Sequence, residues 1–198
     1  FLVLSGLAIS EDDGETFTRY SSVPVFERTD SEMLFRVPHT VMFDDDKFKF
    51  WYGGGSEFIQ GKDKTLPVYD VRYLESKDGL DIPKEGKTIL KTQENEYRIG
   101  RPFVIKKENN FMMFYGYSSE DKHYQLGYAM SKDGLNWVRD DENVGIELSA
   151  EGWDSEMMAY PCVLEVSDKT YLFYNGNNYG EDGFGYASGP DGHLKIPQ

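Results

Sequence analysis

The chain has 198 residues, enough for one domain with a buried core or for part of a larger one. Thirty-five Asp and Glu against 21 Lys and Arg give a formal net charge of −14, which repels phosphate backbones and anionic membrane surfaces. We therefore expect no nucleic-acid partner and no membrane partner. The single cysteine, Cys162, excludes an intrachain disulfide and a thiolate zinc site within one chain.

The first segment, residues 1–9, is apolar and resembles part of a secretory signal. No basic residue precedes it and it continues into a motif that recurs later, so we interpret it as a strand. No run approaches the eighteen or so apolar residues of a membrane helix, and we expect a soluble chain without a motif that assigns a compartment. The chain does not begin with Met, which suggests that a segment upstream is absent.

A turn that places Asp-Gly shortly after a Ser occurs four times along the chain. Its glycines are Gly14, Gly79, Gly134 and Gly192, so the turn returns about every sixty residues. In such turns Asp bonds the backbone and Gly permits a positive φ, and we interpret them as structural. With 15 % aromatic residues and 20 glycines, the composition indicates many short strands joined by tight turns.

Two further landmarks keep the same order and spacing. A proline opens an apolar run at Pro38, Pro102 and Pro161, and an aromatic run that stops at a small or polar loop follows each time, at 50–52, 114–115 and 173–174. Each repeat therefore holds about four short strands, which is typical of a propeller blade. We predict an all-β fold, a β-propeller of four-stranded antiparallel blades. The blades are expected at 1–30 (the end of one blade), 31–94, 95–150 and 151–198.

The antiparallel order predicts where a site lies. If the proline strand is innermost and runs downward, the residues before each proline and the loops after each aromatic strand meet at one face, the upper face. Carboxylates, arginines, aromatics and amides gather there, and these groups together suit a sugar site. The expected binding residues are Arg36, His39, Arg98, Arg101, Tyr117, Trp153, Tyr160, Asn175 and Asn177.

Four carboxylates at this face are candidate catalytic residues. Glycoside hydrolysis uses two carboxyl groups that flank the scissile bond. Asp154 and Glu156 follow Trp153 and directly precede an inner strand, and Glu32 and Glu96 hold similar places before the other prolines. The alternative interpretation is that these acids cap strands or pair with the arginines of the same face.

The motifs Gly6-Leu-Ala-Ile-Ser-Glu-Asp-x-Gly-x-Thr-Phe17, Tyr128-Ala-x-Ser-Lys-Asp-Gly-x-x-Trp137 and Trp153-Asp-Ser-Glu-Met157 resemble a group of bacterial proteins often encoded with surface-polysaccharide genes. That group is related to the five-bladed propeller glycosidases, the superfamily of arabinanases, invertases and levansucrases. The resemblance implies a ring of five blades, of which this chain would hold the last three. It also implies a glycoside hydrolase relative that acts on a bacterial polysaccharide or oligosaccharide.

The chain departs from the better-known members of that superfamily at one point. In those enzymes an acid precedes the inner-strand proline directly or nearly so, whereas Val37, Arg101 and Tyr160 stand there in this chain. A noncatalytic carbohydrate-binding propeller is therefore the alternative. A scaffold for protein interaction and a sialidase-like enzyme, in which arginines would grip the carboxylate of an acidic sugar, are further hypotheses.

We expect carbohydrate as the partner, and a homodimer if the ring is incomplete. The three histidines lack metal-ligand spacing, and we predict no metal and no cofactor.

Overall fold

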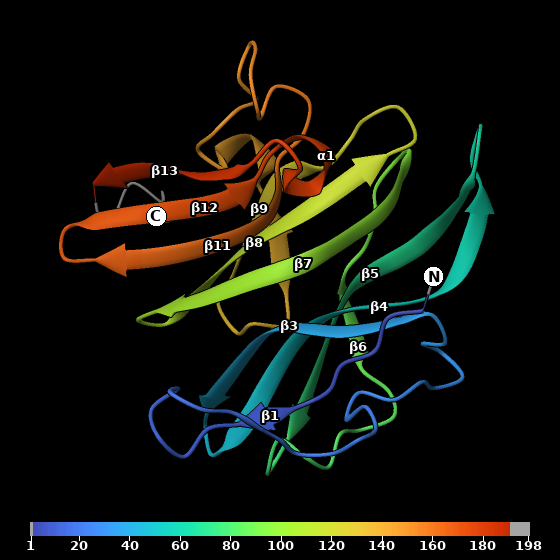
Figure 1. Ribbon diagram of the computed structural model, residues 1–198, viewed down its shortest axis with the longest axis vertical. Coiled ribbons are helices and arrows are strands. Elements are labelled where there is room, and N and C mark those ends of the chain that lie inside the picture. Colours follow the sequence, from blue (N-terminus) through green and yellow to red (C-terminus); the bar gives the residue numbers. More distant parts are fainter. Residues whose placement is uncertain (1, 191–198) are drawn as a thin grey trace.

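The computed structural model describes residues 2–190, and nearly all of its regular structure is β-strand (Figure 1). Two short strands, β1 (Ala8–Ile9) and β2 (Thr18–Arg19), pair near the N-terminus. The first large sheet holds β3 (Phe35–Asp44), β4 (Lys47–Gln60), β5 (Thr65–Ser76) and β6 (Lys87–Leu90). The second holds β7 (Glu96–Lys107), β8 (Asn110–Ser119), β9 (Gln125–Ser131) and β10 (Trp137–Arg139). The third holds β11 (Ala159–Val166), β12 (Lys169–Asn175) and β13 (Phe184–Pro190).

Each sheet is antiparallel and follows chain order, so the proline strands β3, β7 and β11 come first in their sheets. A single parallel bridge between Tyr69 and Arg98 links the first sheet to the second. Figure 1 shows the sheets as a fan, with β7 and β8 between the β3–β5 group and the β11–β13 group. The predicted all-β blades are confirmed; the last expected turn, at Gly192, and His193 lie outside the described residues.

Strand β8 shows how neighbouring sheets share a core. Phe111 and Tyr115 are buried against the first sheet, and the alternate residues Met112 and Phe114 are buried against the third. This alternation follows from the two-residue period of a strand. Each such side chain contributes about 1.5–3 kcal/mol by leaving water, so the inter-sheet cores hold the fan together.

The recurring turns are structural, as predicted. At the turn after β9, the Ser131 hydroxyl accepts a hydrogen bond from the Gly134 amide at 2.9 Å, and Asp133 accepts from the next two amides at 2.9 and 2.8 Å. Gly134 has φ +73°, a conformation that glycine adopts without a steric penalty. The turns at Gly14 and Gly79 repeat the serine-to-glycine bond.

Candidate functional site

The first strand of each sheet carries a bulge at its proline. In β7 the pairing slips between Gly100 and Phe103, and in β11 between Ala159 and Cys162. Arg101 and Tyr160, which lie inside these bulges, have φ of +57° and +61°. Such a conformation costs a residue other than glycine roughly 1–3 kcal/mol. Bulges redirect side chains, and here they bring the Arg101 guanidinium to 3.8 Å from the centre of the Tyr160 ring.

These two residues belong to a group that we call the arginine–tyrosine cluster. It comprises Tyr69, Arg98, Arg101, Tyr124, Tyr160 and Tyr179. The ring centres of Tyr124, Tyr160 and Tyr179 lie 6.0–6.3 Å from one another. The Arg98 guanidinium lies 4.1 Å from the centre of the Tyr124 ring. All three large sheets therefore contribute side chains to one place.

Two glycines make room for the buried part of the arginine–tyrosine cluster. Gly100 and Gly116 face each other across β7 and β8. A Cβ on Gly100 would lie 2.9 Å from the Tyr69 ring, and one on Gly116 would lie 2.9 Å from the Tyr124 ring. The two tyrosine hydroxyls hydrogen-bond each other, and burial raises the pKa of both. Both phenols are therefore neutral at neutral pH.

Tyr179 forms the outer part of the arginine–tyrosine cluster. It lies on a single turn, α1 (Asn177–Gly180), in which Asn178 and Tyr179 have φ of +51° and +62°. The Asn175 side-chain amide donates to the Tyr179 carbonyl at 2.9 Å, and Arg98 donates to the Tyr179 hydroxyl at 3.1 Å. Asn175 thus fixes the Tyr179 backbone and Arg98 fixes the Tyr179 hydroxyl, although the residue is 48 % exposed. A side chain that is both ordered and exposed is suited to contact a ligand.

His39 borders the arginine–tyrosine cluster from β3. Its Nε2 is buried and has no hydrogen-bond partner. Burial, with a smaller contribution from the positive charge of Arg101, lowers the pKa of His39 to about 3. The imidazole is therefore neutral at physiological pH, and it adds no charge to the two arginines.

Glu32 and Arg36 are not part of the arginine–tyrosine cluster, and they bond each other and neighbouring groups. Glu32 is fully buried and accepts from Arg36 at 2.5 Å, from the Tyr52 hydroxyl at 2.6 Å and from Arg72 at 3.0 Å. Arg36 also donates to the carbonyls of Glu27 and Pro83. Because both side chains are enclosed and bonded, they hold the first sheet together and present nothing to a substrate.

The hydrogen bond from Tyr52 to Glu32 has counterparts in the other two sheets, where the tyrosine that ends the aromatic run also donates to a carboxylate. Tyr115 in β8 donates its hydroxyl to Asp141, and Tyr174 in β12 donates to Asp154 at 2.8 Å. Asp154 is only 5 % exposed. A carboxylate that accepts from the tyrosine at the end of the aromatic run is thus a repeated structural feature. Glu32 and Asp154 are its buried examples, and Asp141 is partly buried.

Glu96 and Tyr117 also have structural neighbours. Glu96 accepts two hydrogen bonds from Arg139, both at 2.9 Å, and Arg139 also pairs with Asp141. The Arg139 guanidinium lies 5.2 Å from the centre of the half-buried Tyr117 ring. Glu96 therefore belongs to an ion-pair network on the second sheet, and Tyr117 contacts the arginine of that network.

The segment before β11 contains the remaining predicted residues. Trp153 stacks on Tyr174 with ring centres 5.2 Å apart and packs in the core between the second and third sheets, so it is not free to stack on a sugar. Asn177 is buried and accepts from the amides of Glu156 and Met157 at 2.9 and 3.0 Å. Asn177 thereby holds this segment in place, as Asn175 holds Tyr179.

Glu156 differs from the other three predicted acids. Its side chain is exposed, and among residues 2–190 its carboxylate has no hydrogen-bond or ion-pair partner. The next residue, Met157, is buried with Tyr124 and packs against Tyr160. Glu156 therefore flanks the arginine–tyrosine cluster along the chain.

No model of a known protein family matches the chain. An uncharacterized protein of Mycobacterium tuberculosis, Rv1502, is 31 % identical over 183 residues, and the match covers 92 % of this chain. The same identity is found with a protein from a second strain of that organism. The chain spans 60 % of the length of these curated relatives.

Solved structures share the arrangement of strands. A thermostable family-43 glycoside hydrolase matches 98 % of this chain and 68 % of its own, with a TM-score of 0.69 and 18 % identity. The fold is that of the β-propeller glycoside hydrolases. A family 117 glycoside hydrolase of Zobellia galactanivorans matches 81 % of this propeller chain and 54 % of its own, with a TM-score of 0.64 and 16 % identity. A Bombyx mori family-32 β-fructofuranosidase in complex with sucrose matches 82 % and 34 %, with a TM-score of 0.59 and 19 % identity.

Three tyrosines of the propeller site were not among the predicted binding residues. Tyr69 and Tyr124 lie near the start of the third strand of their blades, and Tyr179 lies in a loop after an aromatic strand. The end of a second strand and the start of a third meet at the same face of an antiparallel blade. The blade topology therefore predicts that Tyr69 and Tyr124 lie at this face. The contacts of Tyr179 depend on a left-handed turn that no sequence motif predicts.

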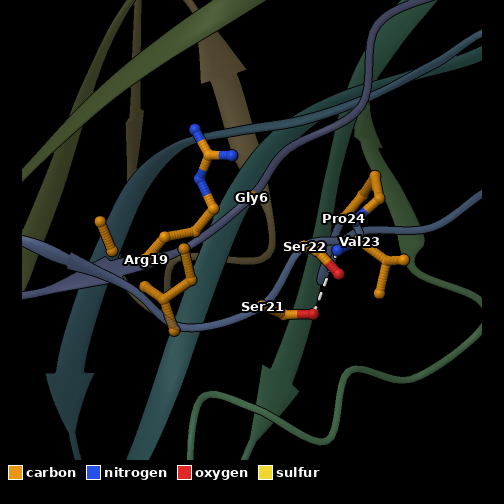
Figure 2. A pocket seen from close by; sticks show the side chains of 8 residues that line it. Gly6, Arg19, Ser21, Ser22, Val23 and Pro24 are labelled. Atoms are coloured by element: carbon orange, nitrogen blue, oxygen red, sulfur yellow. Dashed lines mark hydrogen bonds between the residues drawn. The ribbon is translucent and has the colours of Figure 1, made fainter.

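Several hollows lie on the surface of the described propeller blades. One, of about 350 Å³, is formed near the N-terminus by residues that include Gly6, Arg19, Ser21 and Val23, and it contains none of the predicted site residues (Figure 2). Another, of about 320 Å³, lies beside Tyr69 and is lined by polar groups that include Asp70. Burial raises the pKa of Asp70, although Arg72 donates to its carboxylate at 2.7 Å. This second hollow extends the polar surface next to the arginine–tyrosine cluster.

Within residues 2–190 no helix is long and apolar enough to cross a membrane. In the same part of the chain, no group of three or more His, Cys, Asp or Glu residues is arranged to hold a metal ion.

Proposed function

We propose that this chain is the recognition part of a carbohydrate-active propeller that binds a bacterial polysaccharide or oligosaccharide at the arginine–tyrosine cluster. The observation that carries the proposal is the position of Arg101 and Tyr160, which lie in strained bulges directly before the inner-strand prolines. The superfamily resemblance places substrate-facing acids at or near these positions. Aromatic rings stack on the apolar faces of sugars and guanidinium groups donate to hydroxyls, so this cluster suits a saccharide.

The wider architecture belongs to the same proposal. We divide the chain into blades at 1–30, 31–94, 95–150 and 151–198, and we infer a ring of five blades for the whole protein. The curated relatives are longer than this chain, which supports a larger ring. A second copy of the chain that completes the ring is the alternative.

A binding screen of the whole protein against neutral and acidic oligosaccharides tests this function. Tyr179→Ala removes a ring that is 48 % exposed, so the fold should persist while affinity falls at least tenfold. Tyr20→Ala is the matched control, because Tyr20 is 51 % exposed on the N-terminal segment. Failure of every saccharide to bind, or equal losses in the two variants, would overturn the proposal and favour a protein scaffold.

Hydrolysis is the second candidate function, and the exposed, unpartnered Glu156 favours it. A catalytic carboxylate must reach the substrate, and Glu156 is the predicted acid that meets this requirement. Glu156→Gln should lower turnover of a bound saccharide at least a hundredfold and leave its binding intact. Asp154→Asn should alter turnover less than threefold, because Asp154 is buried against Tyr174. Unchanged turnover in Glu156→Gln would remove Glu156 from the mechanism.

A further inference from the structure

We propose that the saccharide bound at the arginine–tyrosine cluster carries an anionic group, and that Arg98 and Arg101 pair with it. This inference rests on the proposed function and narrows it to acidic saccharides. A carboxylate and a sulfate ester share the chemistry that a guanidinium recognises, since both present paired oxygens to its forked donors.

Ion pairs distinguish Arg98 and Arg101 from the three other arginines of the large sheets. Arg19 and Arg28 lie outside these sheets, are exposed, and also have no ion pair within residues 2–190. Arg36, Arg72 and Arg139 all lie within 3.1 Å of a carboxylate oxygen. In the described residues neither Arg98 nor Arg101 has a carboxylate within the 4.0 Å of an ion pair. The partly buried guanidinium of Arg98 has lost part of its hydration, and an anion would return the corresponding Coulomb energy. The missing partner is therefore expected from the ligand.

Arg98 is held in one orientation before any ligand arrives. Its Nε donates to the Ser118 hydroxyl at 2.6 Å and its Nη2 donates to Tyr179 at 3.1 Å. The guanidinium also lies 4.8 Å from the Tyr97 ring centre and 4.1 Å from that of Tyr124. A side chain that is already ordered loses little entropy on binding, so the site is organised in advance for its ligand.

The second guanidinium is accessible. Arg101 is exposed, and its bulge holds it over Tyr160. The phenols of Tyr69 and Tyr124 and the imidazole of His39 are uncharged at neutral pH, so the two arginines are the charged groups of the arginine–tyrosine cluster itself. The whole chain carries a formal charge of −14 and repels anions over much of its surface. An acidic saccharide is attracted where these two positive charges stand without a carboxylate.

The test is an array of uronate-bearing, sulfated and neutral oligosaccharides probed with the whole protein, followed by titration calorimetry on each hit and its neutral counterpart. For a uronate, the counterpart is the methyl ester. We expect the anionic form to bind at least tenfold more tightly than the neutral form. A hit set of uronates identifies a carboxylate as the anion, and a hit set of sulfated saccharides identifies a sulfate.

Arg101→Gln should abolish the preference for the anionic over the neutral form. Arg101→Lys should restore part of that preference, because lysine returns the positive charge without the paired N–H donors of a guanidinium. Arg19→Gln is the matched control: it removes the same charge from an exposed arginine of the N-terminal sheet and should change affinity less than twofold.

Equal binding of the anionic and neutral forms would overturn the inference and leave the proposed function standing. Equal losses in Arg101→Gln and Arg19→Gln would also overturn it, because long-range charge would then explain the preference. Failure of every saccharide to bind would remove both the function and the inference.

Discussion

Arginines and tyrosines meet at several places in the described blades, and two of these places differ in one respect. In the first sheet, Arg36, Arg72 and Tyr52 surround the carboxylate of Glu32, which is fully buried. In the arginine–tyrosine cluster no carboxylate of residues 2–190 forms an ion pair with either arginine, and Tyr179 and Arg101 are exposed. A group that contains its own counter-charge stabilises the fold, whereas a group that lacks one is available to a ligand.

The largest effect should come from Glu32→Gln, which leaves the buried Arg36 and the partly buried Arg72 without their shared anion, although Arg72 keeps Asp70. Loss of one partner of a buried ion pair costs about 3–5 kcal/mol, so the free energy of unfolding should fall by that amount. Denaturant unfolding measures it, and saccharide affinity of the folded variant should stay within twofold. Glu27→Gln, an exposed side chain near Arg36, should change stability by less than about 0.5 kcal/mol. A loss below about 1 kcal/mol in Glu32→Gln would contradict the structural role that distinguishes the Glu32 group from the arginine–tyrosine cluster.

A middle-sized effect should come from His39 at the border of the arginine–tyrosine cluster. The folded chain keeps this imidazole neutral down to its pKa of about 3, whereas the unfolded chain protonates it near the ordinary value of 6.5. Between these values the unfolded state binds more protons, so stability falls as the pH falls. We expect about 1–2 kcal/mol to be lost between pH 7 and pH 5. His39→Gln should flatten this part of the profile in denaturant titrations, and an unchanged slope would show that His39 is not the source.

The smallest effect on stability should come from Arg101→Gln. Arg101 is exposed and has no carboxylate to leave unpaired, so the free energy of unfolding should change by less than about 0.5 kcal/mol. Thermal and denaturant unfolding of this variant check the value. A loss of 2 kcal/mol or more would mean that Arg101 belongs to the structural framework, and the two places would then have the same role.

Much of the fold could be predicted because the signal repeats. The serine-to-glycine turns, the prolines at 38, 102 and 161 and the aromatic runs each report a local requirement of a strand or a turn. Local requirements are visible in a sequence because the residues that satisfy them are neighbours. The same repetition drew attention to Glu32 and Asp154, which in the structure accept hydrogen bonds from Tyr52 and Tyr174.

The amino-acid sequence by itself determined the all-β blades, their order and the face on which polar residues gather. Only the tertiary structure decided which of those residues meet, because contact depends on side-chain direction and on partners in other blades. The bulges that turn Arg101 and Tyr160, the glycine pair beneath Tyr69 and Tyr124, and the left-handed turn of Tyr179 bring distant residues together. The spacing of residues along one strand does not predict these contacts. Each contact depends on a strained backbone conformation that is offset by packing, and that packing forms only after the sheets assemble.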